Sequence, residues 1–165
     1  VLIIAIDRED VMIEHLQQFA AGFPGWLQWV AIMLIAAIPF VESHFGAAIG
    51  VLIGMPPALA VLAAVLGNAA SMLAFVVIAD AARRRARRDA APDAPSRRPR
   101  LRRLFERFGI PGVALLGHPT QLSAATMVAF GAPRARVVVW ELVSIVLWAV
   151  LMATLLALGM NVLAH

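Results

Sequence analysis

The chain has 165 residues, of which 62% are hydrophobic, and its mean hydropathy is +0.85. Ordinary soluble domains contain roughly 45–50% apolar residues, so this composition excludes a typical soluble enzyme. The chain has no cysteine, which excludes disulfides, thiolate metal sites and cysteine nucleophiles, and its 14 basic residues are all arginines.

Long stretches without charged residues indicate helices that cross a membrane. A helix needs ~20 apolar residues to span the hydrocarbon layer. Four stretches without Asp, Glu, Lys or Arg reach this length: 15–41, 43–79, 108–133 and 142–165. We therefore expect an all-α integral membrane protein that forms a single membrane domain over residues 1–165.

An amphipathic helix is predicted over residues 9–21. Its apolar side chains, such as Val11 and Phe19, fall on one helical face, and most of its charged side chains fall elsewhere. We expect this helix to lie on the membrane surface. A turn rich in Gly and Pro over residues 22–25 ends it.

Two short apolar arms follow, Trp26–Phe40 and Phe45–Met55, on either side of Pro39 and Glu42. Each arm is short for a full crossing. A broken helix of this kind is tolerated at membrane depth where protein or water covers its free backbone groups. The pattern predicts a re-entrant hairpin, and two ordinary crossings joined by a tight turn remain an alternative.

A full transmembrane helix is predicted next, because Pro56 and Pro57 can begin a helix and Ala58–Ala79 is uncharged throughout. It leads into an Arg-rich loop over residues 80–107, which carries most of the arginines. Apart from Phe105 the loop has no aromatic residue, and it lies between membrane segments, so we interpret it as cytoplasmic rather than as a nucleic-acid surface. Within it we expect a flexible linker and a short basic amphipathic helix near residues 101–108.

The same layout returns in the second half. A shift of 77 positions superposes Gly54 on Gly131 and Pro56 on Pro133, and seven of the sixteen positions from 46 to 61 are then identical. We expect two repeats, 26–79 and 108–160, each with a hairpin and one crossing. Since each hairpin returns to its own side, counting crossings makes the repeats inverted. The second repeat would have arms Ile110–Leu116 and Leu122–Phe130, a polar break over 117–121 that contains Pro119, and a helix over Val137–Gly159.

Three residues are candidates for proton coupling. Glu42 is the one acid between Glu14 and Asp80, and an ionisable group at membrane depth is a functional candidate because burying its charge is costly. His44 lies two residues further on, and His118 lies in the matching break of the second repeat, so the two could relay protons. The alternatives are that Glu42 marks a loop at the membrane surface and that each His is a hydrogen-bonded loop residue. We expect no metal site, since nothing in the sequence sets a ligand geometry.

Other residues in the membrane segments receive structural interpretations. Gly46, Gly50 and Gly54 recur every four residues, a spacing that lets helices approach closely. Asn68 follows Gly67 inside the first long helix and needs a hydrogen-bond partner, which the hairpin tip could supply. Glu141, one turn beyond two arginines, is expected to form an ion pair at the membrane interface.

Part of the chain resembles a known family. Ile38–Glu42, Gly46–Gly50, Gly54–Pro56 and Leu66–Asn68 resemble the first half of the small multidrug export protein family. That family is similar to the DedA, or SNARE-associated, membrane proteins, which have paired re-entrant hairpins. The resemblance covers roughly Ile38 to Gly159.

The resemblance implies that Glu42 is the acid of the hairpin. It also implies structural roles for Pro39, Gly54, Pro56, Gly67 and Asn68. The chain departs from the family pattern at Ser43-His44, where an Arg commonly follows the acid. A second departure is His118-Pro119-Thr120-Gln121, where a Gly-rich turn or the arginines of DedA proteins would stand. The family name implies drug export, and the DedA relatives imply lipid translocation.

These features predict a multi-pass transporter of the bacterial inner membrane that couples protons to export of a small or amphipathic substrate. A DedA-like lipid flippase or scramblase is one alternative, and a non-transporting membrane interaction protein is another. The expected partners are membrane lipids, a small-molecule or lipid substrate and protons, and a homo-oligomer is left open. No Ser/His/Asp order, phosphate loop or nucleotide fingerprint is present, so we expect neither an enzyme nor a cofactor.

Overall fold

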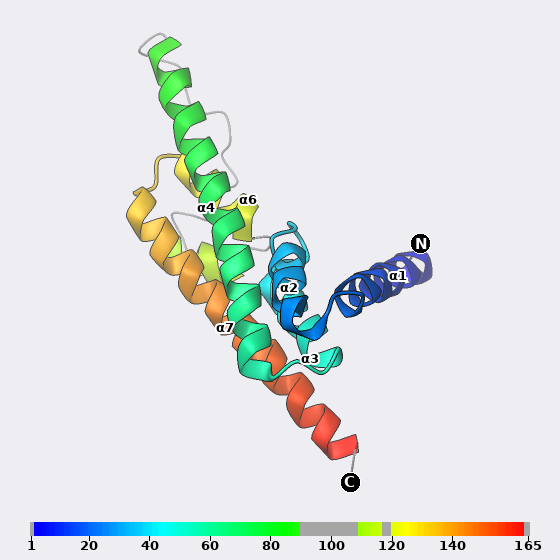
Figure 1. Cartoon of the computed structure of the whole chain (residues 1–165). Helices are drawn as coiled ribbons and strands as arrows, with labels where there is room; N and C mark the ends of the chain where they lie inside the picture. The colour runs from blue at the N-terminus through cyan, green and yellow to red at the C-terminus, as the bar shows by residue number, and fades with distance from the viewer. Residues whose placement is uncertain (1, 90–108, 117–119, 164–165) are drawn as a thin grey trace. The chain divides into compact units, whose positions relative to one another are not determined.

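The computed structural model describes residues 2–89, 109–116 and 120–163, and all the regular structure in these ranges is helical (Figure 1). The all-α prediction is therefore confirmed. The chain divides into two compact units: unit 1 comprises Val1–Asn68 and Ile145–His165, and unit 2 comprises Ala69–Ser144. Two long helices, α4 (Pro57–Asp89) and α7 (Arg134–Leu163), contribute residues to both units.

Unit 1 begins with α1 (Leu2–Ala21), which starts earlier than the predicted helix over 9–21. A short 3-10 turn, η1 (Gly25–Leu27), leads directly into α2 (Gln28–Ala36). The chain bends by 114° between Val11–Ala21 and Gly25–Ala36. Pro24 explains the bend, because it sits in an extended conformation (φ −53°, ψ 142°) and cannot continue a helix.

The two short arms of the predicted hairpin form α2 and α3 (Glu42–Leu52), joined by a turn over residues 37–41. A Cβ placed on Gly46 would lie 2.8 Å from the Cβ of Ala36, and one placed on Gly50 would lie 3.6 Å from Ile32. As the residue number rises along α3 it falls along α2, so the helices are antiparallel. Glu42, which was expected in the break, is instead the first residue of α3.

Three close approaches hold α4 against this hairpin. A Cβ on Gly46 would lie 3.3 Å from Ala64, and one on Gly50 would lie 2.6 Å from Ala60, so α3 and α4 are also antiparallel. A Cβ on Gly67 would collide with the main-chain carbonyl group of Met33 on α2. Ala149 and Ala153 of α7 complete the apolar core of this unit. Small residues at the helix contacts therefore bring these backbones close together.

The end of α3 is a glycine cap. Gly54 has a φ of +86°, and the backbone N–H groups of Gly54 and Met55 donate to the carbonyl oxygens of Val51 and Gly50, each at 3.0 Å. This is the Schellman arrangement, in which a left-handed residue satisfies the free carbonyls of a helix end. The predicted close approach does not occur at Gly54, because a Cβ there would meet nothing within 4 Å.

In unit 2 the short helix α6 (Thr120–Ala129) also ends in a glycine cap. Residues 109–116 are helical as well. Gly131 has a φ of +102°, and the N–H groups of Gly131 and Ala132 donate to Val128 and Met127, again at 3.0 Å. Each of these bonds lies 77 residues after its counterpart at Gly54. The predicted polar break over 117–121 is shorter than expected at its end, because α6 already includes Thr120 and Gln121.

Within the described residues, two segments are long and apolar enough to cross a membrane, Pro57–Ala86 and Arg134–Met160. A third is found there if the bent pair Val11–Ala21 and Gly25–Ala36 counts as one span. The two long helices predicted from the sequence are thus confirmed. α4 continues through residues 80–89, the start of the predicted Arg-rich loop, because Ala and Arg are strong helix formers. The expected linker and basic helix within residues 90–108 lie outside the described residues.

Candidate functional site

Glu42 is buried at the tip of the hairpin, with only 1% of its surface exposed. The alternative of a carboxyl in an exposed loop does not fit this burial. Phe40 and Glu42 both adopt left-handed backbone conformations, with φ of +75° and +57°. Each such residue costs about 1–2 kcal/mol when it is not glycine. Strained backbone that surrounding structure holds in place is typical of functional sites, and here it fixes where the carboxyl of Glu42 projects.

His44 accompanies Glu42 on the first turn of α3. Its Nδ1 lies 3.9 Å from Oε2 of Glu42, and 17% of its side chain is exposed. The His44 ring also lies against the ring of Phe45, with centroids 4.5 Å apart. The distance to Glu42 is too long for a hydrogen bond but suits an ion pair when the imidazole is protonated. The structure therefore brings together two of the three candidates for proton coupling.

Ser43 ties the hairpin tip to the last helix. Its buried hydroxyl donates a hydrogen bond of 2.9 Å to the main-chain carbonyl of Ile145 on α7. On α4, Asn68 is fully buried as well. The antiparallel contacts of α3 with α4 pair residue 50 with 60 and 46 with 64, and one further turn of this register sets Glu42 at the level of Asn68. Glu42, Ser43 and Asn68 are thus three buried polar side chains at the level of the hairpin tip.

A second buried carboxyl, Glu141, lies in unit 2. Glu141 of α7 is fully buried, and the hydroxyl of Ser123 on α6 lies 2.6 Å from its Oε1. The predicted interfacial ion pair with the arginines one to two turns earlier is not what the structure shows. Arg134 instead lies 3.9 Å from Asp80 of α4, which also accepts hydrogen bonds from Arg84 at 2.9 and 3.2 Å.

Other fully buried polar residues accompany Glu141. Ser144, one turn further along α7, has a buried hydroxyl that makes no hydrogen bond to any residue the structure describes. The hydroxyl of Thr120 lies 3.5 Å from the amide oxygen of Gln121, at the start of α6. The signal that could have identified this cluster is its spacing: Glu141 and Ser144 are three residues apart and therefore share a helical face.

The remaining candidates have defined places where the structure describes them. Pro39 lies in the turn between α2 and α3, and Pro56 and Pro133 immediately precede α4 and α7. His118 and Pro119 lie outside the described residues, so the predicted role of His118 stays a prediction. Among the residues that are described, no group of three or more His, Cys, Asp or Glu side chains could hold a metal ion.

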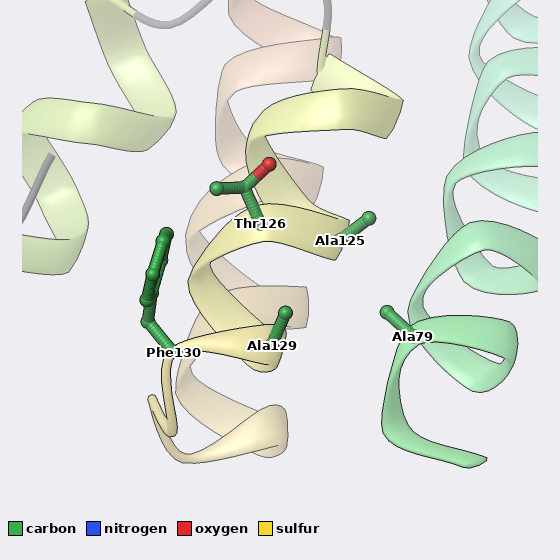
Figure 2. Close-up of a pocket in the computed structure, with 5 residues that line it drawn as sticks. All are labelled: Ala79, Ala125, Thr126, Ala129 and Phe130. Carbon is green, nitrogen blue, oxygen red and sulfur yellow. The ribbon is translucent and has the colours of Figure 1, made fainter. Parts of the chain in front are cut away.

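Unit 2 also has a groove between α4 and α6, with a volume of about 370 Å³. Figure 2 shows the methyl groups of Ala79 and Ala125 facing each other across it. Ala129, Phe130 and the hydroxyl-bearing Thr126 supply the rest of the lining. Apolar groups with a single hydroxyl suit an apolar or amphipathic molecule better than a charged one.

Comparison of the chain with protein-family models, with curated proteins and with solved structures finds no match.

Proposed function

We propose that this chain is a multi-pass transporter of the bacterial inner membrane that couples proton movement to export of a small or amphipathic substrate. The observation that carries the proposal is the burial of Glu42 where two short antiparallel helices meet, on a left-handed backbone. Broken helices that place a carboxyl at membrane depth are a recurring design of transport sites in secondary transporters. A carboxyl in such a place can alternate between a charged and a neutral form as it gives up and takes up a proton.

The recurrence of local structure every 77 residues supports the proposed repeat. Both halves place a Gly with positive φ after a short helix, the same pair of capping bonds, a Pro two residues later and then a long apolar helix. Under the proposal each half forms a re-entrant hairpin and one crossing, and the halves are inverted. The arginines after Asp80 would then lie on the cytoplasmic side, as expected from the positive-inside rule.

The burial of the hairpin tip favours transport over a scaffold that only recruits partners. A surface scaffold gains nothing from a buried carboxyl, whose desolvation costs free energy. The groove beside Thr126 supports an amphipathic substrate, because its lining combines methyl groups and a ring with one hydroxyl. A lipid flippase would use the same groove, and it is distinguished from the exporter by its independence of the proton gradient.

The test replaces Glu42 with Gln, which preserves size and hydrogen bonding and removes the titratable proton. Purified protein in liposomes is assayed for dye efflux driven by an imposed proton gradient, and separately for lipid flipping. We expect Glu42→Gln to lose at least tenfold in gradient-driven efflux and to stay folded. His44→Ala is expected to lose less, because the imidazole contacts the carboxyl only at 3.9 Å.

Glu14→Gln is the matched control, since Glu14 is an exposed acid on α1 and the substitution is the same. It should transport at the wild-type rate. If Glu42→Gln also transports at the wild-type rate, proton coupling through Glu42 is wrong. Lipid flipping that persists in Glu42→Gln without any gradient would favour the scramblase instead.

A further inference from the structure

The hydroxyl of Ser123 lies close to two oxygen atoms that can each accept its hydrogen. Its Oγ lies 2.6 Å from Oε1 of Glu141 and 3.1 Å from the main-chain oxygen of Thr120. Both distances are within hydrogen-bonding range. A serine hydroxyl has one hydrogen to donate and two lone pairs that accept, and a main-chain oxygen can only accept. Ser123 can therefore donate to only one of these two oxygens at a time.

The two protonation states of Glu141 resolve this competition differently. When the carboxyl is ionised, Ser123 donates its hydrogen to Oε1, and the contact to Thr120 has no hydrogen. When Oε1 gains a proton, the new O–H donates to Ser123, whose own hydrogen turns to the oxygen of Thr120. One O–H bond forms on Glu141, one proton is taken from water, and no other covalent bond changes. Both short contacts then contain a hydrogen, and no heavy atom has to move.

The matching place in unit 1 shows that packing does not require this polar pair. Positions 123 and 141 lie 77 residues after Gly46 and Ala64, the two residues that meet where α3 crosses α4. That crossing is closed by one glycine and one methyl group. A buried carboxyl is costly in either charge state, so its presence at the same crossing in unit 2 needs a reason other than helix packing.

Few titratable groups surround Glu141 in the part of unit 2 that the structure describes. Residues 109–116 and α6 carry none, and α4 carries none between Ala69 and Ala79. Arg134 lies two turns before Glu141 on α7 and is directed to Asp80, which also binds Arg84. Arg136 is exposed. The hydroxyl of Ser123, 2.6 Å from Oε1, is thus a group whose hydrogen bond can adapt to the charge of this carboxyl.

We propose that Glu141 is a second proton-binding carboxyl, and that Ser123 is the adaptor that stabilises both its protonation states. A role of Glu141 in transport rests on the proton coupling proposed for Glu42 and extends that coupling to unit 2. Proton binding itself does not depend on that role. It is therefore tested by observing the carboxyl directly rather than by measuring transport.

The experiment is pH-difference infrared spectroscopy of the full chain in liposomes, which detects the C=O stretch of a protonated carboxylic acid. Glu42→Gln is used as the background, because Glu42 and Glu141 are the two buried acids among the side chains that the structure describes. We expect a titrating C=O band in this background, and we expect it to disappear when Glu141→Gln is added. Ser123→Ala should shift the band to higher frequency, because the acid loses its hydrogen-bond acceptor.

Ser144→Ala is the matched control, since it removes a buried hydroxyl on α7 that bonds none of the described residues. It should leave the band in place. A titrating band that survives Glu141→Gln unchanged overturns the proposal. If Glu141→Gln does not fold, Ser123→Ala decides, and a band that it does not shift is equally contrary. Loss of transport in Glu42→Gln with the Glu141 band intact would support both proposals. Wild-type transport in Glu42→Gln contradicts the proton coupling of Glu42, whereas a band that survives Glu141→Gln contradicts proton binding by Glu141.

Discussion

The two helix crossings, α3 with α4 in unit 1 and α6 with α7 in unit 2, share a backbone and differ in chemistry. Each short helix ends in the same glycine cap, and each long helix begins after a proline at the matched position. At the crossing itself, Gly46 meets Ala64 in unit 1, whereas Ser123 contacts Glu141 in unit 2. Caps and prolines therefore determine the path of the chain, and the side chains at the crossing are left free to be apolar or polar.

A second matched pair extends the comparison. Gly67 in unit 1 touches the backbone of Met33, and Ser144 lies 77 residues later with a buried hydroxyl. Unit 1 thus uses its small residues for close backbone contact, and unit 2 carries hydroxyls at the corresponding places. The buried acids do not correspond, since Glu42 begins the short helix α3 and Glu141 lies in the long helix α7. If transport uses both acids, the two halves contribute differently.

The largest expected effect is at the closest backbone contact. In Gly67→Ala the added methyl group would collide with the carbonyl of Met33, which cannot move as a side chain can. Although Ala favours helix over Gly by about 1 kcal/mol, we expect a net loss of more than about 3 kcal/mol in unfolding free energy. The measurement is denaturation in mixed micelles followed by circular dichroism.

Gly159→Ala is the control for this substitution, because Gly159 also lies inside a helix and a Cβ there would meet nothing within 4 Å. It should gain about 0.5–1 kcal/mol. Wild-type stability in Gly67→Ala would contradict the close approach of α2 to α4.

Exchanging the side chains of the two crossings is expected to have an intermediate effect. Gly46→Ser installs the residue of unit 2, but its Cβ would lie 2.8 Å from the Cβ of Ala36, so we expect a loss of about 1–3 kcal/mol. The reverse exchange, Ser123→Gly, removes the contact to Glu141 and should cost about 1.5–3 kcal/mol. Both are measured by the same denaturation experiment. A Gly46→Ser protein as stable as wild type would show that the crossings have equal space and that their difference is not steric.

The smallest expected effect tests the shared caps. Gly54→Ala and Gly131→Ala each place a Cβ on a residue with positive φ, at a cost of about 1–2 kcal/mol. At Gly131 the new Cβ would also lie 2.8 Å from Nη2 of Arg83, but that group is the end of a flexible side chain and can move aside. Similar losses in thermal stability are therefore expected at both positions. Gly25→Ala, with no contact and no positive φ, serves as the control, and a loss at only one cap would separate the two halves.

Much of the helical layout could be predicted from local sequence signals. Uncharged stretches gave the two long helices, and Gly and Pro gave the places where the chain turns. The ends were less predictable. α4 continues into the arginines because helix propensity does not require apolar residues, whereas the apolar stretch alone indicated an end at Ala79. The spacing of Gly46, Gly50 and Gly54 predicted the same role for all three. Gly46 and Gly50 make close contacts within α3, whereas Gly54 lies beyond the end of α3 and forms the cap.

The candidate site could be predicted only in part. Glu42 stands out in the sequence because it is an acid between two uncharged stretches. Glu141 follows Arg134 and Arg136 closely, and this spacing suggested an interfacial ion pair. Its burial depends on which face of α7 meets α6, and that rotation is set by the packing of many side chains.

The sequence by itself determined the helical class, the apolar length of α4 and α7 and the glycine turns before them, because each depends on residues close together in the chain. The tertiary structure alone decided that Ser43 bonds the backbone of Ile145 and that Ser123 contacts Glu141. These pairs are separated by 102 and 18 residues, and no local preference specifies them. Contacts of this kind exist only once the helices have packed, since packing fixes the rotation and register that bring the two side chains together.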